Sequence, residues 1–468
     1  MATACEGTWR PSANPSPVRA VHAALMRTGK VLLIAGSGND RDNFAAGTFR
    51  TAVYDPASDS FATNIATPYD LFCSGHAFLP DGRLLVAGGT ASYQDASHQW
   101  YGERRATLFD PATQTYQSVP DMAIGRWYPS VVGTGDGKLV TLAGYDGQGS
   151  LSNTFQVLDP ASSTWTADRG IGNAAAGIYS PLYPSLHLLA DGRLFYSGNH
   201  AFDEGTGTPP FLWNVATNQV SWIADNSAID ADTRDQGASV LLPPAQAQKV
   251  MVIGGGGTAS TAVIDLSKAN PNYVAGPPID AGKEYVSAVI LPDGRVLQTG
   301  GATAARDVAG VQYVHSTQIL DPKTMTWTKV TDQPTDRSYH SGALLLPDGR
   351  VLAFGGNPID GSFEMAIDIY SPGYMTKTRP KITSAPTSVT WGSGFTVKTS
   401  APIASAVLIR PSATTHSSDT EQRSVDLAVS GTTLTVPANH NLTPPGWYML
   451  FVRDASGVPS VASWVEVG

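Results

Sequence analysis

Phe78–Gly89 has the sequence FLPDGRLLVAGG, and this phrase decides the fold because the chain holds seven versions of it. Each version has a hydrophobic segment, a tight turn of the Asp-Gly type, a second hydrophobic segment and closing glycine. The other clear copies are Val289–Gly301 and Leu344–Gly356. Weaker copies are Ala24–Gly36, Gly133–Gly144, Leu188–Gly198 and, most degraded, Val240–Gly255. The closing glycines follow one another at spacings of 53, 55, 54, 57, 46 and 55 residues.

This spacing predicts a β-propeller. A repeat of about 50 residues with four short strands is typical of a kelch-type blade, so seven copies predict seven blades. A third strand follows the glycines and often ends at an Asp-Pro turn, as at Pro56 and Pro111, where Asp caps the turn and Pro presets φ. An aromatic residue marks the fourth strand and is expected to fill space between adjacent blades. These aromatic residues are Phe61, Tyr116, Trp165, Trp222 and Trp327.

The two ends of the chain have different expected roles. The seventh blade ends at Tyr370–Pro372 without a fourth-strand aromatic, and the N-terminal segment supplies Trp9. We therefore expect a strand near Trp9 to close the ring, which leaves no open sheet edge. After about Arg379 the repeat stops, and short alternating strands predict an immunoglobulin-like β-sandwich. The expected all-β chain is a seven-bladed kelch propeller over residues 1–378 and a sandwich over 379–468.

Composition excludes several classes of function. Of 468 residues, 42% are hydrophobic and 15% are charged, which is typical of a globular chain. The net charge is −9 and basic residues form no block, so nucleic acid is not an expected partner. No apolar run approaches the length of about 18 residues that a membrane span needs. Two cysteines, Cys5 and Cys73, are too few for a disulfide framework, although a single Cys5–Cys73 bond is an alternative.

The turn aspartates give a register for the central axis, which the innermost strands of a propeller line. Counting back eight residues from them gives one residue in each of five blades: Cys73, Tyr128, Tyr183, Tyr285 and His340. An aromatic residue at a fixed repeat position is commonly a packing residue, and a buried Cys commonly acts as a small hydrophobe. A mixture of Cys, Tyr and His at one level nevertheless favours a functional site. The spacing does not say which of the five bind a metal.

Four motifs around these positions resemble the copper radical oxidases, the family that includes galactose oxidase and glyoxal oxidase. The motifs are DLFCSG at 70–75, RWYPS at 126–130, RSYHS at 337–341 and RPSATTH at 410–416. The closing segments PGWYMLF at 445–451 and GVPS at 457–460 are similar to the family as well. The resemblance covers nearly the whole chain and implies both the propeller and the C-terminal sandwich.

The resemblance implies one copper ion and a radical cofactor made from the protein. Tyr128 would be the equatorial ligand and radical site, with Cys73 joined to its ring through a thioether. Tyr339 would be the axial ligand that takes the substrate proton, and His340 and His416 would complete the site. Imidazole and phenolate donors in a square-based set suit Cu(II). Copper and the tyrosyl radical would each accept one electron, and O₂ would then reoxidise the site and leave as hydrogen peroxide.

Six other histidines carry no family motif. His440 is a rival to His416, but it lies in a polar turn and is interpreted as solvated. The others are interpreted as structural, and only His76 lies close enough to Cys73 in sequence to be a candidate neighbour of the site. These residues are His22, His76, His187, His200 and His315. Cys5 has no counterpart in the family and is interpreted as a free thiol unless it pairs with Cys73.

The predicted substrate pocket differs from that of galactose oxidase. Ala302 stands where galactose oxidase has a sugar-binding Gln, its sugar-binding Arg has no counterpart (Arg234 lies in another context), and Tyr145 replaces the Trp that stacks on its thioether. The segments RWYP at 126–129, LYP at 182–184 and IYSP at 369–372 favour the glyoxal oxidase branch. Candidate pocket or radical-shielding residues are Trp127, Tyr145, Phe44, Tyr183 and Tyr285, with Asn39 and Arg41 near the mouth.

The sequence therefore predicts an oxidase of small aldehydes, taken as hydrates, or of simple primary alcohols. A galactose or primary-alcohol oxidase is the alternative within the family. A non-catalytic kelch interaction propeller is the alternative of another class, and a sialidase-type hydrolase is disfavoured because the ring lacks arginines and acids. Because peroxide release is better tolerated outside the cytoplasm and the family is mostly exported, we expect an extracellular or secreted monomer whose export signal has been removed; the present start, MATACEGTW, lacks one.

Overall fold

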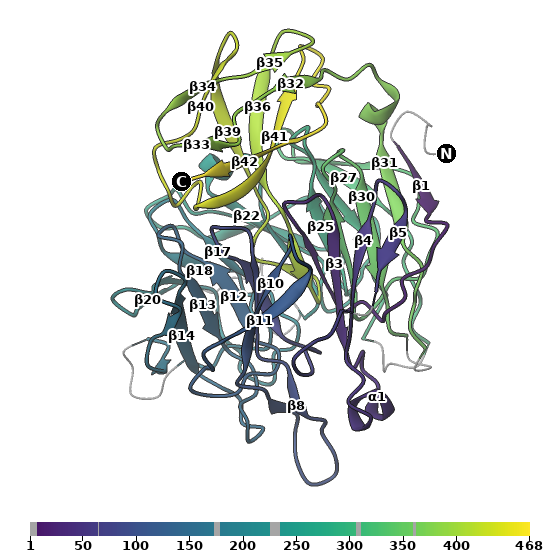
Figure 1. The fold of residues 1–468 in the computed structure, drawn as a ribbon, viewed down its shortest axis with the longest axis vertical. Helices are drawn as coiled ribbons and strands as arrows, with labels where there is room; N and C mark the ends of the chain where they lie inside the picture. The colour runs from purple at the N-terminus through teal and green to yellow at the C-terminus, as the bar shows by residue number, and fades with distance from the viewer. Residues whose placement is uncertain (1–6, 64, 173–177, 225–234, 306–309, 359–361) are drawn as a thin grey trace.

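The computed structural model describes residues 7–63, 65–172, 178–224, 235–305, 310–358 and 362–468. These residues form seven blade sheets and a second group of strands, which gathers at one end of the molecule and is coloured yellow-green in Figure 1. In the described ranges, no helix is long and apolar enough to cross a membrane. The predicted seven-bladed propeller with a C-terminal immunoglobulin-like sandwich is confirmed.

The blades are antiparallel sheets whose strands run from the axis outward in chain order. Blade one has β2 (His22–Leu25), β3 (Val31–Gly36), β4 (Arg50–Asp55) and β5 (Ser60–Ala62). Blade two has β6 (Gly75–Phe78), β7 (Leu84–Ala87), β10 (Ala106–Asp110) and β11 (Thr115–Val119). Blade three has β12 (Ser130–Gly133), β13 (Leu139–Leu142), β14 (Thr154–Asp159), β15 (Thr164–Trp165) and the added β16 (Arg169–Gly170). Blade four has β17 (Leu186–Leu188), β18 (Leu194–Tyr196), β19 (Phe211–Asn214) and β20 (Gln219–Trp222).

Blades five and six follow the same order, and blade seven takes its outer strand from the N-terminal segment. Blade five has β21 (Ala238–Leu241), β22 (Lys249–Ile253), β23 (Thr261–Asp265) and β24 (Tyr273–Ala275). Blade six has β25 (Ser287–Ile290), β26 (Val296–Thr299), β27 (Gln318–Asp321) and β28 (Thr326–Lys329). Blade seven has β29 (Ser341–Leu345), β30 (Val351–Gly355), β31 (Asp368–Pro372) and β1 (Gly7–Pro11). Short extra elements are α1 (Arg41–Ala45), β8 (Thr90–Ser92), β9 (Tyr101–Gly102), η2 (Ala245–Ala247) and η3 (Gly373–Thr376).

Blade seven is built from both ends of the propeller segment. Strand β1 pairs antiparallel with β31, and Trp9 lies opposite Tyr370 with ring centroids 5.1 Å apart. The Thr331 hydroxyl donates to the Gly7 carbonyl at 2.8 Å, which ties β1 to the preceding blade as well. The seventh sheet therefore gains its outer strand from the N-terminal segment, and its edge is paired.

The repeated Asp-Gly-Arg turn has a local physical cause. In blade two, the Arg83 backbone N–H and Nε both donate to the Asp81 carboxylate, at 2.9 and 2.8 Å. Gly82 between them has φ 85°, a backbone conformation that glycine adopts without steric cost. The same Arg-to-Asp bonds form in blades four, six and seven. The three turn residues thus fix the inner hairpin and, with it, the register of the strand that leads up to the axis.

Most of the fourth-strand aromatic residues fill space between blades, as predicted. Trp165 and Trp327 each donate their indole N–H to a proline carbonyl that precedes their own blade, at 2.7 and 2.8 Å. Tyr116 reaches the preceding blade through its hydroxyl, which is 3.1 Å from that of Thr51. Trp222 differs, because it is 53% exposed and packs only edge-on against Phe211. The prediction that these aromatic residues fill space between blades is therefore wrong for Trp222.

The C-terminal strands form the sandwich. Its main sheet order is β33 (Ser388–Val389), β42 (Ser463–Val467), β41 (Gly446–Arg453), β36 (Ser405–Arg410), β39 (Arg423–Ser430), β40 (Thr433–Thr435) and β34 (Gly394–Thr396). A separate pair consists of β32 (Ile382–Ser384) and β35 (Lys398–Thr399). Val407, Ile409, Met449 and Phe451 belong to the same core cluster as Val289 of blade six. The sandwich is therefore packed against the propeller through a shared hydrophobic core.

One segment of the sandwich enters the propeller axis, and we call residues 413–423 the axial finger. Its strands β37 (Ala413–Thr415) and β38 (Ser418–Asp419) extend the sheet of blade one, where Thr415 lies opposite His22. Finger side chains also donate to innermost-strand carbonyls of three further blades. These bonds are Thr420 to Val131 at 2.6 Å, Arg423 to Leu188 at 3.1 Å and Gln422 to Ala288 at 2.7 Å. The finger is thus held from several sides, and it carries His416.

Candidate metal centre

The five residues found by counting back from the turn aspartates share one unusual backbone conformation. All five have φ in the left-handed region, and each stands just before an innermost strand: Cys73 (61°), Tyr128 (64°), Tyr183 (46°), Tyr285 (60°) and His340 (65°). Gln236 of blade five is a sixth member, with φ 59°. Positive φ is uncommon for residues other than glycine and costs about 1–3 kcal/mol each, so the surrounding structure must hold it. We call these six residues the axial ring.

Backbone hydrogen bonds connect neighbouring members of the axial ring. The Tyr128 N–H donates to the Cys73 carbonyl at 2.9 Å, and the Tyr183 N–H donates to the Tyr128 carbonyl at 3.1 Å. The Tyr285 N–H donates to the Gln236 carbonyl at 2.6 Å. Five of the six strained residues are therefore fixed from an adjacent blade, which gives their side chains defined directions.

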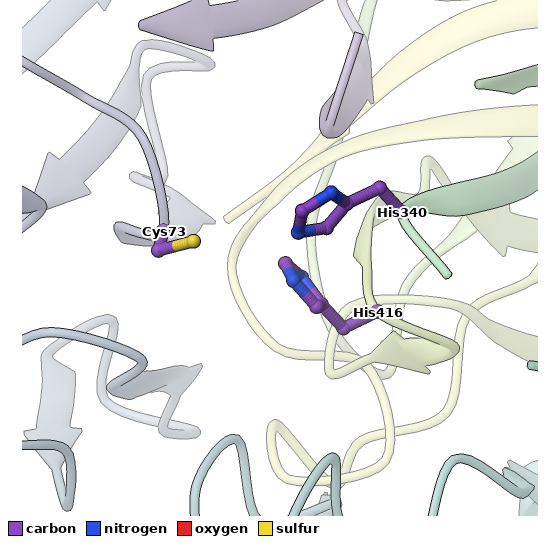
Figure 2. A group of neighbouring side chains, drawn as sticks. All are labelled: Cys73, His340 and His416. Carbon is purple, nitrogen blue, oxygen red and sulfur yellow. The ribbon is translucent and has the colours of Figure 1, made fainter. Parts of the chain in front are cut away.

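The ring and the finger bring the sequence-predicted residues together. The Cys73 sulfur and one ring nitrogen from each of His340 and His416 all lie within 4.8 Å of one another (Figure 2). The Tyr128 and Tyr339 hydroxyls are hydrogen-bonded to each other, and His416 Nε2 lies 2.8 Å from the Tyr128 hydroxyl. All five side chains are buried, with Tyr339 the most accessible at 8%. Residues from blades two, three and seven and from the sandwich therefore converge on one point.

Burial keeps the Tyr128, His416 and Cys73 side chains neutral in the protein alone. Burial raises the pKa of the Tyr128 phenol well above its ordinary value, and the neighbouring Cys73 and Tyr339 add to the shift. Burial likewise lowers the pKa of His416, with His340 contributing next. The pKa of the Cys73 thiol is raised by burial, while a hydrogen bond with Tyr128 acts in the opposite direction. A phenolate here would be a buried anion, so it needs a cation close by.

The donor set fits a copper ion. Two phenol oxygens, from Tyr128 and Tyr339, and two imidazoles, from His340 and His416, offer the mixed nitrogen and oxygen ligands that suit Cu(II). The neutral imidazole of His416 has its lone pair available for a metal, and a divalent ion would supply the missing positive charge beside the two phenolates. The Cys73 thiol lies beside Tyr128, which is the placement that a sulfur link to that ring requires.

Two tryptophans cover the Tyr128 ring. Trp127 has its ring centroid 4.0 Å from that of Tyr128, and Trp100 stacks on Trp127 at 4.6 Å with an interplanar angle of 8°. Tyr145 lies on Trp127 at 6.0 Å. Trp100 comes from the β8–β9 hairpin of blade two, and sequence reasoning missed it. The available signal was the long segment between the second and third strands of that blade, which departs from the repeat.

A cavity of about 420 Å³ lies beside the centre. Its aromatic lining is Phe72, Trp100, Trp127, Tyr145, Phe202, Tyr285 and Tyr339. Its polar lining is Asn39, Gln94, Gln99 and Glu204, and the Tyr145 hydroxyl donates to Glu204 at 2.6 Å. A larger cleft of about 570 Å³ between blades three and four shares no residue with the centre, so the smaller cavity is the one placed for chemistry there.

Three other residues considered from the sequence, Phe44, Tyr183 and His440, do not line the cavity. Phe44 is not part of its lining and packs on Tyr93 instead, at 5.0 Å between centroids. Tyr183 supports the ring, since its hydroxyl donates to the Ser74 carbonyl and its ring lies 4.5 Å from Tyr128. His440 donates from Nδ1 to the Gly135 carbonyl at 2.9 Å, in the larger cleft. Cys5 and Arg234 lie outside the described residues.

Comparisons with known proteins agree with this geometry. Residues 379–467 match the family described as galactose oxidase-like, Early set domain, and residues 126–167 match the Kelch motif. The chain is 28% identical to a galactose oxidase of Gibberella zeae, across 98% of this chain and 70% of that protein. It is 27% identical to an aldehyde oxidase GLOX of Vitis pseudoreticulata, across 98% of this chain and 97% of that protein. Along nearly its whole length the chain is therefore similar to copper radical oxidases, the family that its motifs resemble.

A solved structure shares the whole architecture of this chain. It is that of a novel fungal alcohol oxidase of the AA5 family in complex with copper, and it matches with a TM-score of 0.83 at 24% identity. The match covers 98% of this chain and 99% of that one, so propeller and sandwich correspond together. At this level of identity the match concerns the fold, and the substrate has to be argued from the cavity.

Proposed function

We propose that the chain is a mononuclear copper radical oxidase that oxidises small aldehydes, as hydrates, or simple primary alcohols, and converts O₂ to hydrogen peroxide. The observation that carries the proposal is the convergence of two phenols, two imidazoles and a thiol on the axis, beside a cavity lined by aromatic residues. The likeness to galactose oxidase and to aldehyde oxidase GLOX supports the same class of chemistry.

The cofactor would be made from Cys73 and Tyr128. Its formation breaks the S–H bond and a ring C–H bond beside the phenol oxygen, forms an S–C bond, and sends two protons and two electrons to O₂. Tyr128, Tyr339, His340 and His416 would hold one copper ion. That ion would accept one electron during turnover, and the Tyr128 radical would accept the other. Trp127 and Trp100 cover the Tyr128 ring and would keep solvent away from the radical.

Tyr339 is the residue placed to receive the substrate. It lines the cavity, whereas Tyr128, His340 and His416 do not, and it is hydrogen-bonded to Tyr128. We assign Tyr339 the role of base: its oxygen takes the proton of the substrate hydroxyl. The hydrogen on the adjacent carbon then passes to the Tyr128 oxygen. Both an alcohol and an aldehyde hydrate carry a hydroxyl and a hydrogen on one carbon, so the same two steps serve either substrate.

The cavity favours small neutral substrates. Seven of the thirteen described residues that line it are aromatic, and the charged group among those thirteen is the Glu204 carboxylate, which disfavours anions. Ala302 is buried, is not part of the lining and has no side-chain polar group with which to hold a sugar. We therefore expect galactose to be a poor substrate. Steady-state turnover on glyoxal, methylglyoxal, glycolaldehyde, glycerol, benzyl alcohol and galactose tests this, and a clear preference for galactose would overturn it.

The cofactor itself is tested by mass. Copper and oxygen should lower the intact mass by about two hydrogens, and should join the peptides that contain Cys73 and Tyr128 through a bond that thiol reductants leave intact. A free Cys73 thiol after this treatment would instead indicate a binding propeller, and a reducible link to Cys5 would indicate a disulfide. We also propose an extracellular or secreted, monomeric enzyme with its domain boundary at 378/379. Detection of activity in the culture medium and the mass in solution test the first two points.

A further inference from the structure

We propose that His22 of blade one is a positioning residue that holds Cys73 in the backbone conformation in which its thiol meets the Tyr128 ring. The inference rests on the proposed function, because it concerns the formation of the thioether. His22 carries no family motif, and the sequence alone indicates only a structural histidine. Its contacts give it a more specific task.

The contact that carries the inference is a hydrogen bond to a strained backbone. Cys73 has φ 61°, and its N–H donates to His22 Nε2 at 3.2 Å. The carbonyl of Cys73 accepts from the Tyr128 N–H at 2.9 Å. The cysteine is therefore held on both sides, by His22 at its nitrogen and by its future bonding partner at its oxygen. Without the first bond, a buried N–H would lack a partner and the left-handed conformation would lose one of its two restraints.

For three other members of the axial ring, the acceptor that corresponds to His22 is a backbone carbonyl of the ring itself. Tyr128, Tyr183 and Tyr285 each donate their N–H to the carbonyl of a ring residue in the preceding blade. The blade before Cys73 is blade one, which contributes no residue to the axial ring. There the acceptor is the imidazole of His22, on strand β2. Between blades one and two, the His22 side chain thus supplies the acceptor that a ring carbonyl supplies in those three places.

The surroundings fix His22 firmly enough for this role. It is fully buried, and its backbone pairs with Thr415 of the axial finger, the residue before His416. The His76 ring packs edge-on against it at 5.2 Å. Nε2 accepts the Cys73 N–H, so the ring proton of the neutral imidazole is on Nδ1. In the described part of the chain, Nδ1 has no hydrogen-bond partner, so the bond to Cys73 is the one hydrogen bond that this side chain makes there.

The test compares variants that keep or remove the acceptor. In His22→Gln, the amide oxygen can still accept the Cys73 N–H, whereas in His22→Leu no acceptor remains. His76→Leu is the matched control, because His76 is also buried beside His22 and its ring has no hydrogen-bond partner in the described residues. Full-length protein prepared without copper is mixed with copper and oxygen, and the loss of two hydrogens and of the free thiol is followed in time.

We expect His22→Leu to form the link roughly tenfold more slowly, the size expected for one lost buried hydrogen bond, and His22→Gln and His76→Leu to stay within about threefold of the original chain. Once linked, His22→Leu should turn substrate over at nearly the original kcat, because the covalent bond then holds Cys73. Should His22→Leu not fold, His22→Met replaces it, since a thioether is a weak acceptor of similar size.

Two results would overturn the positioning role: an unchanged rate in His22→Leu, or an equal slowing in His76→Leu, which would indicate packing alone. Failure of the original chain to form the link at all would instead refute the proposed function. The two failures are therefore distinct.

Discussion

The buried pair Arg410–Glu421 at the base of the axial finger allows a quantitative prediction. Their side chains are 6% and 1% exposed and are joined by a short hydrogen bond. Burial acts to lower the pKa of Arg410, yet the Glu421 carboxylate outweighs it and raises that pKa. Glu421→Gln keeps the volume but leaves the guanidinium buried without its anion. Removing one partner of such a pair costs about 3–5 kcal/mol.

The structure narrows this range. Arg410 also donates to the carbonyls of Pro445 and Phe78, at 3.1 and 3.5 Å, so backbone dipoles still stabilise part of its charge in the variant. We therefore expect Glu421→Gln to lower the free energy of unfolding by about 3 kcal/mol, near the lower limit of that range. The control is Asp121→Asn, which breaks the Arg104–Asp121 pair; both side chains there are largely exposed, and the loss should stay below about 1 kcal/mol.

Guanidinium unfolding of the copper-free proteins measures both losses. Propeller and sandwich can unfold separately, so fluorescence and circular dichroism must be followed together before a single free energy is assigned. Copper affinity should fall in Glu421→Gln and not in Asp121→Asn, because His416 lies on the finger that Glu421 anchors. Equal, small losses in the two variants would refute the reasoning, since they would mean that the Arg410–Glu421 pair is not desolvated and does not fix the finger.

Three further predictions concern the radical, the pH and the substrate. Trp100→Ala removes the outer stacked ring and should shorten the lifetime of the Tyr128 radical, followed by its absorption. The lost stacking contributes about 0.5–1.5 kcal/mol to its cost in stability, beyond the lost burial of apolar area; an unchanged lifetime contradicts the shielding role. Burial, with Arg423 adding, lowers the pKa of His187 to about 3, so the unfolded chain binds the proton first and stability should fall as pH drops from about 6.5 toward 3, a slope that His187→Gln should reduce in unfolding measured against pH. Glu204→Gln should lower KM for glyoxylate by a few-fold, because it removes a screened repulsion, and leave KM for neutral benzyl alcohol unchanged; a parallel change in both would contradict the charge argument.

The sequence predicted the fold through its turns. The aspartate of each Asp-Gly-Arg turn accepts two bonds from the arginine, so the turn residues fix the hairpin, and counting back from them locates the residue that enters the axis. Gln236 was missed because blade five has Pro243-Pro244 at its turn and offers no aspartate from which to count. The periodic part of the site was therefore predictable wherever local turn chemistry repeats.

Other contacts carry no period and could not be predicted. Trp100 reaches Trp127 from an inserted hairpin, and only the tertiary fold brings the two rings into parallel contact. His22 lies 51 residues before Cys73, and its bond to the Cys73 N–H depends on how blades one and two meet. Phe44, expected near the pocket from the resemblance, packs on Tyr93 instead. Family motifs located the groups that would meet the metal, but not the side chains that hold those groups in place.

Blade one explains how a residue from another domain reaches the axis. Six blades each place a left-handed residue at the ring, and blade one places none there. Its innermost strand β2 pairs instead with β37 of the finger, and directly after β37 comes His416, whose φ of 47° is left-handed as well. The finger therefore contributes to the site the same kind of strained residue that the propeller provides elsewhere. Because β2 pairs with β37, blade one holds Cys73 through a side chain, that of His22. The entry of His416 and the restraint on Cys73 therefore both follow from one local departure from the repeat.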